Sequence, residues 1–471
     1  MLSEGVPPAV LADGTPGHGN TRSRNGDTTS ARNIPHFLRT LFRLLDELAV
    51  RYCVLHSWNL LPEKLYSDLD LAVHPLDKVK LPGVFEALTQ AGYTPIQWGN
   101  YVTNGHGIYF IWEGDSSIET ATLDIIFEHR RAGMILASGE ALVCGRIRRG
   151  EFWIAAPEVE YSYLLAKKAA KAKASPSQSL RLKELVESLG SERTEELAGR
   201  IFQRDLKAQI VEACAKGSID KEFGRLKLKL GQVPLARQMS RRVRYWASEL
   251  RRAILRTINP TGILLAILGP DGAGKSTLIE ALPDALGAGL RRRRVFHWRP
   301  QAFAQRRNKR PVTDPRGQAP RGAVLSIACL SAFFIDYWIG YIFVIRPLLV
   351  ASAIVQFDRY FHDVLVDPLR YRYGGPRWFA AILSRLVPEP DLVILLDAEE
   401  HLIRARKAEL SLPEIKRQRQ AYRSLRFQRA RQAYVRTDSG IEATRVASVA
   451  AVTDFMKERF NKRIGAWMRV V

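Results

Sequence analysis

The sequence predicts an α/β protein with two domains, and three observations support this prediction. The chain has 471 residues, more than a single hydrophobic core usually organises, since domains typically hold ~100–200 residues. Strand-like apolar runs alternate with segments of helical periodicity in both halves. The run GILLAIL at residues 262–268 leads through a glycine-rich loop into helix-forming LIEAL. This strand, loop and helix order is typical of a parallel sheet flanked by helices.

We expect four segments along the chain. Residues 1–33 are rich in Gly, Pro, Ser, Thr, Asn and Arg and contain few large apolar groups, so they are predicted to be disordered. Residues 34–175 form a smaller α/β domain, residues 176–259 a basic helical connector, and residues 260–471 the second α/β domain. In the first domain, helical spacing begins at Ile34 and a further helix begins at Pro157. Its expected strands are residues 52–55, 69–73, 108–112 and 121–127.

The connector carries much of the chain's positive charge. Between Pro234 and Pro260 it contains seven arginines and one acid, Glu249. A basic amphipathic helix of this kind can lie on a membrane or bind nucleic acid, and it can also be a solvated linker. The sequence leaves these readings open.

Charge and cysteine content limit the partners and the cellular compartment that we expect. A net charge of +23 attracts phosphates, nucleic acid or anionic lipid without choosing among them. The four cysteines are far apart and show no CxxC spacing, which indicates neither a zinc site nor a disulfide framework. The first residues lack a basic start followed by a long apolar run, so we expect no secretory signal. We expect a cytoplasmic protein that acts on a small-molecule phosphate acceptor and has no specific nucleic-acid partner, with peripheral contact to anionic membrane and homodimerisation both left open.

The strongest motif is GPDGAGKST at residues 269–277, which fits the pattern G-x-x-x-x-G-K-[ST]. Its glycines allow backbone N–H groups to surround phosphate oxygens, and the following helix N-terminus adds partial positive charge. Lys275 is expected to reach the β- and γ-phosphates and Ser276 to ligate Mg²⁺. The motif therefore predicts ATP and Mg²⁺ as cofactors. The expected nucleotide contacts are Gly269, Asp271, Gly272, Ala273, Gly274, Lys275, Ser276 and Thr277.

A second motif, IVQFDRYFHD, places Asp358 and Arg359 at the end of an apolar run. In parallel α/β sheets this strand end is where ligands bind. Asp358 is predicted to hold Mg²⁺ or to accept the acceptor's proton. Arg359 is predicted to clamp an anionic group. The alternative is that the two residues form only a surface ion pair. A third strand, 391–397, precedes clustered cations that can neutralise a transferring phosphoryl group or simply face solvent.

Residues 260–460 resemble the thymidylate kinase branch of the nucleoside monophosphate kinases. The matching pieces are GPDGAGKST, HWRP at residues 297–300, IRPLLVASAIVQFDRY, and PDLVILLD with the Arg-rich lid. The resemblance implies a P-loop kinase in which Asp358 and Arg359 lie between donor and acceptor. Gly272 stands where some members carry arginine, which implies that the lid supplies the catalytic arginine, with Arg406 and Arg417 as the matches.

Two departures from this family concern the acceptor. FFIDYWIGY places Tyr337 where the family usually has the arginine that reads the nucleotide, which argues against thymidylate. The insertion at residues 306–322 resembles thymidylate-kinase-like proteins encoded with bacterial surface-polysaccharide genes. We therefore expect the acceptor to be a nucleoside monophosphate, a sugar or a sugar phosphate.

The segment 323–355 is apolar enough to span a bilayer, for which ~20 residues suffice. It is nevertheless interrupted by Asp336 and Arg346, whose charges are costly at bilayer depth. We therefore expect a buried core helix.

The first domain carries a second set of candidate residues. Asp68 and Asp70 lie two residues apart on an expected strand, facing one side, and Asp124 lies on a later strand. Three such carboxylates can hold two Mg²⁺ ions for nucleotidyl transfer, or merely solubilise a strand edge. Residues 50–170 resemble the nucleotidyltransferase superfamily, with His56 replacing the glycine before Ser57. Alternative functions are therefore a Mg-dependent nucleotidyltransferase or a non-enzymatic ATP-binding adaptor.

Overall fold

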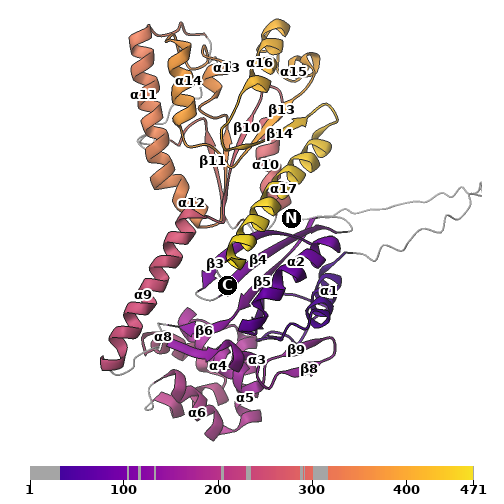
Figure 1. Ribbon diagram of the computed structural model, residues 1–471, viewed down its shortest axis with the longest axis vertical. Coiled ribbons are helices and arrows are strands. Elements are labelled where there is room, and N and C mark those ends of the chain that lie inside the picture. The colour runs from indigo at the N-terminus through magenta and orange to yellow at the C-terminus, as the bar shows by residue number, and fades with distance from the viewer. Residues whose placement is uncertain are drawn as a thin grey trace, which may run out of the picture. The chain divides into compact units, whose positions relative to one another are not determined.

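The computed structural model describes residues 32–102, 105–114, 118–131, 134–202, 206–229, 235–286, 290, 292–300 and 317–469. The described residues from Arg32 onward belong to one compact unit that contains two main β-sheets with their helices (Figure 1). The predicted disordered segment 1–33 lies outside the described residues except for its last two. Most of the insertion at 306–322 also lies outside them.

The first sheet is mixed. Within the described residues it has seven strands in the order β3-β4-β5-β2-β1-β9-β8, of which β2 with β5 and β1 with β9 run parallel and the other neighbours antiparallel. The strand predicted at residues 69–73 is confirmed as β2. The strands are β1 (Tyr52–Val54), β2 (Leu69–Val73), β3 (Thr94–Val102), β4 (Gly105–Glu113), β5 (Ile118–Ile126), β8 (Ile147–Arg149) and β9 (Phe152–Ile154), beside a hairpin of β6 (Glu128–Arg131) and β7 (Met134–Ser138).

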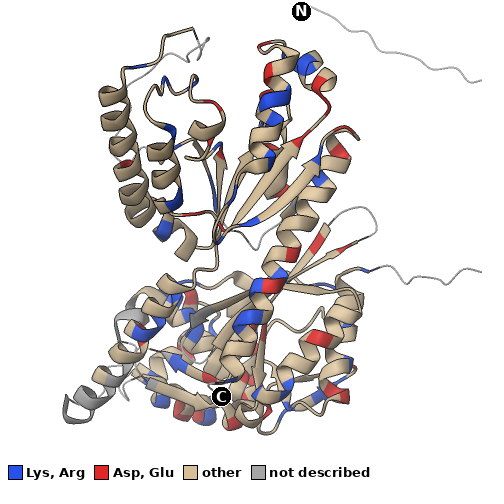
Figure 2. Cartoon of the chain, turned by 45° about the horizontal axis from the view of Figure 1, so that its top comes forward, with Lys and Arg blue, Asp and Glu red and all other residues tan. Residues whose placement is uncertain are grey.

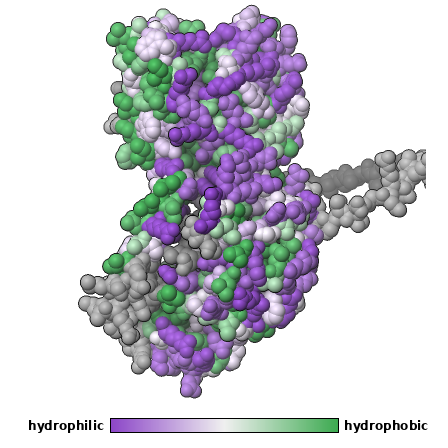
Figure 3. All heavy atoms as spheres, in the orientation of Figure 1, coloured by the Kyte–Doolittle hydropathy of each residue, from purple (hydrophilic) through white to green (hydrophobic). Residues whose placement is uncertain are grey.

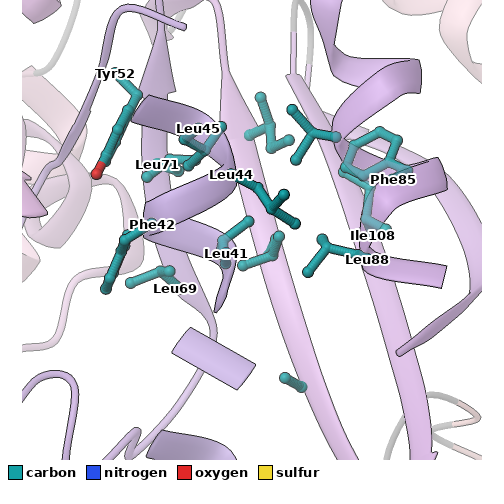
Figure 4. Close-up of a cluster of buried hydrophobic side chains, with 14 of the residues drawn as sticks. Leu41, Phe42, Leu44, Leu45, Tyr52, Leu69, Leu71, Phe85, Leu88 and Ile108 are labelled. Atoms are coloured by element: carbon teal, nitrogen blue, oxygen red, sulfur yellow. The ribbon is translucent and has the colours of Figure 1, made fainter. Parts of the chain in front are cut away.

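Helix α1 (Ile34–Glu47) shows how the sequence builds this sheet's core. The side chain of Asn33 caps its first turn by accepting a hydrogen bond from the backbone N–H of His36 at 3.0 Å. Its apolar spacing buries Leu41 and Leu45 against Tyr52 and other sheet residues (Figure 4). A 3₁₀ turn η1 (Pro75–Lys80), α2 (Leu81–Gln90) and α3 (Gly139–Val143) complete the elements next to the sheet.

Helices from the predicted connector pack together instead of only linking domains. Leu182, Ile201 and Phe223 join residues of α4 in one buried cluster. Ser175 caps the N-terminus of α5 through a capping box, and Ala174 before it packs against this cluster. The helices are α4 (Pro157–Lys171), α5 (Pro176–Leu189), α6 (Ser191–Ile201), α7 (Lys207–Ala215), α8 (Ile219–Lys229) and, after the cluster, α9 (Leu235–Ile258).

The second sheet confirms the predicted parallel α/β arrangement. Five strands of the described chain pair in parallel in the order β11-β12-β10-β13-β14. Alternate residues of central β10 face opposite sides, so that Leu264 packs with α11 and α12 whereas Leu265 packs with α10 and α17. The elements are β10 (Ile263–Leu268), α10 (Lys275–Leu286), β11 (Arg292–His297), β12 (Ala353–Asp358), α13 (Asp363–Val366), α14 (Arg377–Leu386), β13 (Leu392–Asp397), α15 (Glu400–Arg406), α16 (Leu412–Ser424), β14 (Arg431–Arg436) and α17 (Ile441–Met468).

The apolar segment 323–355 is not the fully buried helix that the sequence predicts. It forms α11 (Ala323–Gly340), a π-helical turn η4 (Tyr341–Ile345) and α12 (Arg346–Val350). Leu330 and Tyr337 are buried in the core of the second sheet, but only 22% of the most apolar window is buried. Among the described helices, this one alone is long and apolar enough to cross a membrane by length and composition. Its outer face is exposed.

The C-terminal helix α17 belongs to both cores. Its first half places Val452 and Met456 against the second sheet, and its second half places Phe460 and Ile464 in the core of the first. Arg459 lies between these halves and donates to the backbone carbonyls of Gly262 and Thr261, at 2.8 and 3.0 Å. The last helix therefore stabilises both sheets.

Candidate functional site

The glycine-rich loop between β10 and α10 has a backbone that only glycine accommodates. Gly269 has φ of +147°, and a Cβ there would lie 2.4 Å from the carbonyl oxygen of Leu396. Gly272 has φ of +90°, and its Cβ would lie 2.7 Å from the carbonyl oxygen of Ile403. Bare backbone N–H groups and the N-terminus of α10 therefore form a cradle of the kind that binds phosphate.

Lys275, the first residue of α10, lies folded back on the loop. Its ammonium donates to the carbonyl oxygens of Gly269 and Pro270, at 2.9 and 2.8 Å, and lies 3.6 Å from the Asp271 carboxylate. Burial, helped by the positive charge of Arg359, lowers the pKa of Lys275 to about 8. An anionic ligand in the cradle would restore its charge.

Arg359, predicted to clamp the acceptor, lies instead in a buried ionic network under the loop. It is 3% exposed, contacts Asp271 through one Nη atom, and donates to Asp363 from the other at 2.6 Å. Arg370 binds the second oxygen of Asp271 at 2.6 Å. Although burial raises the pKa of Asp271, the charges of Arg359 and Lys275 hold it well below its usual range. The network therefore holds the loop in position.

Asp358 ends β12, where it pairs in register with Ile267 of β10. One of its oxygens accepts a hydrogen bond from His297 Nδ1 at 2.9 Å. Burial raises the pKa of Asp358, but the His297 hydrogen bond and the charge of Lys275 lower it more, so the net shift is downward. Its other oxygen, Oδ1, is buried and has no hydrogen-bond partner in the described part of the chain. An ionised carboxylate with an unsatisfied oxygen, within range of the charge of Lys275 at the start of α10, fits a Mg²⁺ ligand.

A cavity of about 400 Å³ opens beside α10. Arg406 lines it and donates to the hydroxyl and the carbonyl oxygen of Thr437 at 3.0 and 2.9 Å. The volume is in the range of ligand pockets. The other lining residues, a mixture of apolar and polar side chains, are Gly274, Thr277, Leu278, Ala281, Gly440, Ile441, Thr444 and Arg445.

The lid cations divide into two groups. Lys and Arg gather on α15 and α16 (Figure 2), but Arg417 binds Glu414 and the carbonyl oxygen of Val366 and does not line the cavity. Lys407 follows α15, and its Cβ would lie 3.3 Å from a Cβ on Gly272. The start of the Lys407 side chain therefore lies next to the loop, and its ammonium pairs with Glu409 at 3.2 Å. Of the two predicted lid arginines, the structure brings only Arg406 to this cavity.

The three N-terminal carboxylates line one cavity of about 250 Å³. Asp68 directly precedes β2, and Asp70 pairs in register with Asp124 of parallel β5. Helix α4 contributes lysines to the same cavity. The remaining lining residues include His56, His129, Arg130, Tyr163, Lys167, Lys168 and Lys171.

In the structure, the central carboxylate of this set, Asp70, is paired with neighbouring side chains. Asp70 Oδ2 lies 2.5 Å from the ammonium of Lys167 and 2.8 Å from His56 Nε2, and Oδ1 accepts a hydrogen bond from Tyr163 at 3.0 Å. Although burial raises the pKa of Asp70, the hydrogen bond from His56 and the charge of Lys167 hold it well below its usual range. Across the described residues, no three His, Cys, Asp or Glu side chains are grouped to hold a metal. The structure brings Asp68, Asp70 and Asp124 to one cavity, and the assignment of Mg²⁺ to them stays a prediction.

No protein-family model and no curated protein sequence matches the chain. Solved structures that are similar include a thymidylate kinase from Ehrlichia chaffeensis, with 16% identity over 41% of this chain and 100% of that chain and a TM-score of 0.28. A thymidylate kinase from Candida albicans has 18% identity over 41% of this chain and 93% of that chain, with a TM-score of 0.30. Likeness at this level decides neither the fold nor the activity of this chain.

Sequence reasoning missed several residues around the loop. Arg370 and Thr437 belong to no motif, and their positions depend on long-range folding. Lys407 stood among many lid cations, and the sequence offered no reason to prefer it. A charge count of the loop would have pointed to partners for Asp271, because a carboxylate inside a phosphate-binding loop has to be neutralised.

Proposed function

We propose that the chain is an ATP-dependent phosphotransferase that moves the γ-phosphoryl group to a small acceptor at the carboxyl-terminal ends of the strands of the second sheet. The observation that carries this proposal is the glycine cradle between β10 and α10, with Lys275 inside it and the unsatisfied oxygen of Asp358 at the neighbouring strand end. Phosphate, cation and acceptor groups converge at such strand ends in parallel sheets.

The glycine loop, α10 and the end of β12 would each bind a different part of the reacting groups. The N–H groups of the loop and the N-terminus of α10 bind the phosphate oxygens, and Lys275 turns from the carbonyls of Gly269 and Pro270 toward them. Ser276 and Asp358 would hold Mg²⁺, which when bound neutralises charge on the phosphates. Asp358, already ionised, also orients the acceptor hydroxyl or takes its proton.

The positive charge needed at the moving phosphoryl group comes from the lid side. Arg406 lines the cavity beside α10, and Lys407 lies against Gly272. These cations stabilise the negative charge on the equatorial oxygens in the transition state. Arg359 and Arg370 act through Asp271 by fixing the loop, and so are positioning residues.

The acceptor we propose is a nucleoside monophosphate, a sugar or a sugar phosphate, with a role in bacterial surface-polysaccharide synthesis and a cytoplasmic location. Tyr337, which occupies the position where the resembling family carries a nucleotide-reading arginine, argues against thymidylate as this acceptor. Its hydroxyl is buried and donates to the backbone carbonyl of Trp298. A phenol used in this way does not recognise a phosphate as an arginine does.

Nucleotidyl transfer at the N-terminal cavity is not part of this proposal. That chemistry needs Asp70 as a metal ligand, and Lys167 and His56 occupy this carboxylate. We propose a single catalytic centre in the chain, at the glycine loop.

A screen of ADP release tests the proposed function. The purified chain is incubated with Mg²⁺ and ATP against nucleoside monophosphates, sugars and sugar phosphates, beside Lys275→Ala and Asp68→Asn/Asp70→Asn. We expect acceptor-stimulated ADP release that Lys275→Ala abolishes and the double variant retains. If ATP binds but no acceptor stimulates turnover, the chain is an ATP-binding adaptor and the proposal is wrong.

A further inference from the structure

Helix α11 and the turn after it present a continuous apolar stripe to solvent. Leu325, Ile335, Trp338 and Ile342 recur at helical spacing and are all more than 40% exposed. Figure 3 shows hydrophobic residues over this helix, and Figure 2 draws it almost entirely without charge. The acid of the helix, Asp336, is buried near Arg299 on the inner face. An exposed apolar face of this length marks an interaction surface.

Helix α9 carries a second exposed apolar stripe. Val243, Trp246, Leu250, Ile254 and Ile258 are spaced by three or four residues and are exposed, Trp246 to 68%. The same helix contains seven arginines and a single acid. A helix with an apolar stripe, an aromatic residue and a strongly basic remainder is typical of those that lie in the interfacial plane of a bilayer.

Helix α9 adjoins α12, the helix that follows α11 after the turn η4. Arg256 of α9 donates to the carbonyl oxygen of Val350 at 2.8 Å, and Arg346 of α12 donates to the carbonyl oxygen of Ile258 at 2.7 Å. The C-terminal end of the arginine-rich helix therefore lies against the C-terminal end of the apolar helical segment.

We propose that α9 and α11 form a docking surface for an anionic lipid bilayer, with the apolar stripes in the headgroup and acyl boundary and the exposed Arg251 of α9 on anionic headgroups. The inner face of α11 is held in the core through Leu330 and Tyr337, so the helix lies on the membrane and does not cross it. This surface is independent of the proposed phosphotransfer.

Charge favours a bilayer over the other occupants of such a surface. A second copy would bring together two chains of net charge +23 and their arginine-rich helices. A nucleic acid would match the arginines but would leave the uncharged stripe of α11 in water. A bilayer with anionic lipid satisfies both features at once.

The test is co-sedimentation of the full chain, without nucleotide, with vesicles of phosphatidylcholine alone or mixed with phosphatidylglycerol. We expect binding to the mixed vesicles that weakens as salt rises. Arg251→Gln removes an exposed cation of α9 and should weaken binding about fivefold. Leu250→Ser/Ile254→Ser and Ile335→Ser/Trp338→Ser should each weaken it at least about tenfold.

Leu76→Ser and Lys216→Gln provide matched controls, since both side chains are exposed and lie on neither helix. They should bind like the parent chain, and thermal melting by circular dichroism should be the same for all variants. Equal sedimentation of every variant, or none by the parent chain, would overturn the proposal. It would also be overturned by a concentration-dependent dimer that Ile335→Ser/Trp338→Ser dissociates, or by a preference for a DNA or RNA oligomer over the vesicles.

Discussion

Binding of ATP should take up a proton on Lys275, and the amount follows from the structure. Its ammonium is buried among loop carbonyls with a pKa of about 8, against the ordinary 10.5. At pH 8 about half of the side chains are therefore neutral, and phosphate oxygens in the cradle restore the charge. We expect uptake of about half a proton at pH 8 and about a tenth at pH 7, and an affinity about fivefold weaker at pH 9 than at pH 8.

Calorimetry with Mg²⁺-saturated ATP in two buffers of different ionisation enthalpy measures this uptake. Lys275→Arg provides the control, because its guanidinium stays charged at these pH values. The variant should bind without the pH-dependent uptake. If the heats of the parent chain are equal in both buffers at pH 8, or if Lys275→Arg shows the same uptake, Lys275 does not change its charge and the reasoning about its burial fails.

The same pKa shift has a consequence for stability. Between pH 8 and 10.5 the unfolded chain binds more protons at Lys275 than the folded chain, because the folded pKa is the lower one. The free energy of unfolding contributed by this residue therefore rises with pH across that window. In Lys275→Arg this rise should be absent.

Five further variants test the buried ion pairs, the lid arginines and the N-terminal cavity. Arg359→Met should lower the free energy of unfolding in urea by about 3–5 kcal/mol because it removes the ion pair of the buried Asp363 carboxylate, whereas Tyr422→Phe removes one hydrogen bond to Asp363 and should cost only about 1 kcal/mol. Unchanged stability with a raised KM for the acceptor would contradict this role. Arg406→Ala should lower kcat for ADP formation by a factor on the order of 10³ and Arg417→Ala by less than about twofold, and equal losses of turnover would refute the division of the lid. Lys167→Met should also cost about 3–5 kcal/mol in urea unfolding, yet leave ADP formation intact, and lost turnover in a folded variant would link the N-terminal cavity to catalysis.

Local pattern was enough to predict much of the fold. The strand at residues 69–73 and the runs in β10 and β13 were readable because buried parallel strands are short apolar runs. The helix at Pro157 was readable because proline and acidic residues mark its first turn. The sequence did not predict that α17 packs in both cores, because no local signal tells which sheet an apolar helix face covers.

Part of the candidate site was also predictable from the local sequence. The glycine loop has a fixed spacing dictated by backbone geometry, so Gly269, Gly272 and Lys275 were identified from the sequence. The partners of charged groups were not, because Arg359 and Asp271 are 88 residues apart in the chain. The exposure of α11 was also missed, since composition alone does not distinguish an apolar helix inside a core from one on a surface.

The most direct measurement of the central claim follows labelled ATP. With the acceptor found by the ADP screen, ATP labelled at the γ-phosphate and ATP labelled at the α-phosphate are compared in the parent chain and in Lys275→Ala. The account predicts that γ-label passes to the acceptor, that α-label stays in ADP, and that Lys275→Ala transfers neither. Transfer of α-label with release of pyrophosphate, or γ-transfer that survives Lys275→Ala, would contradict it.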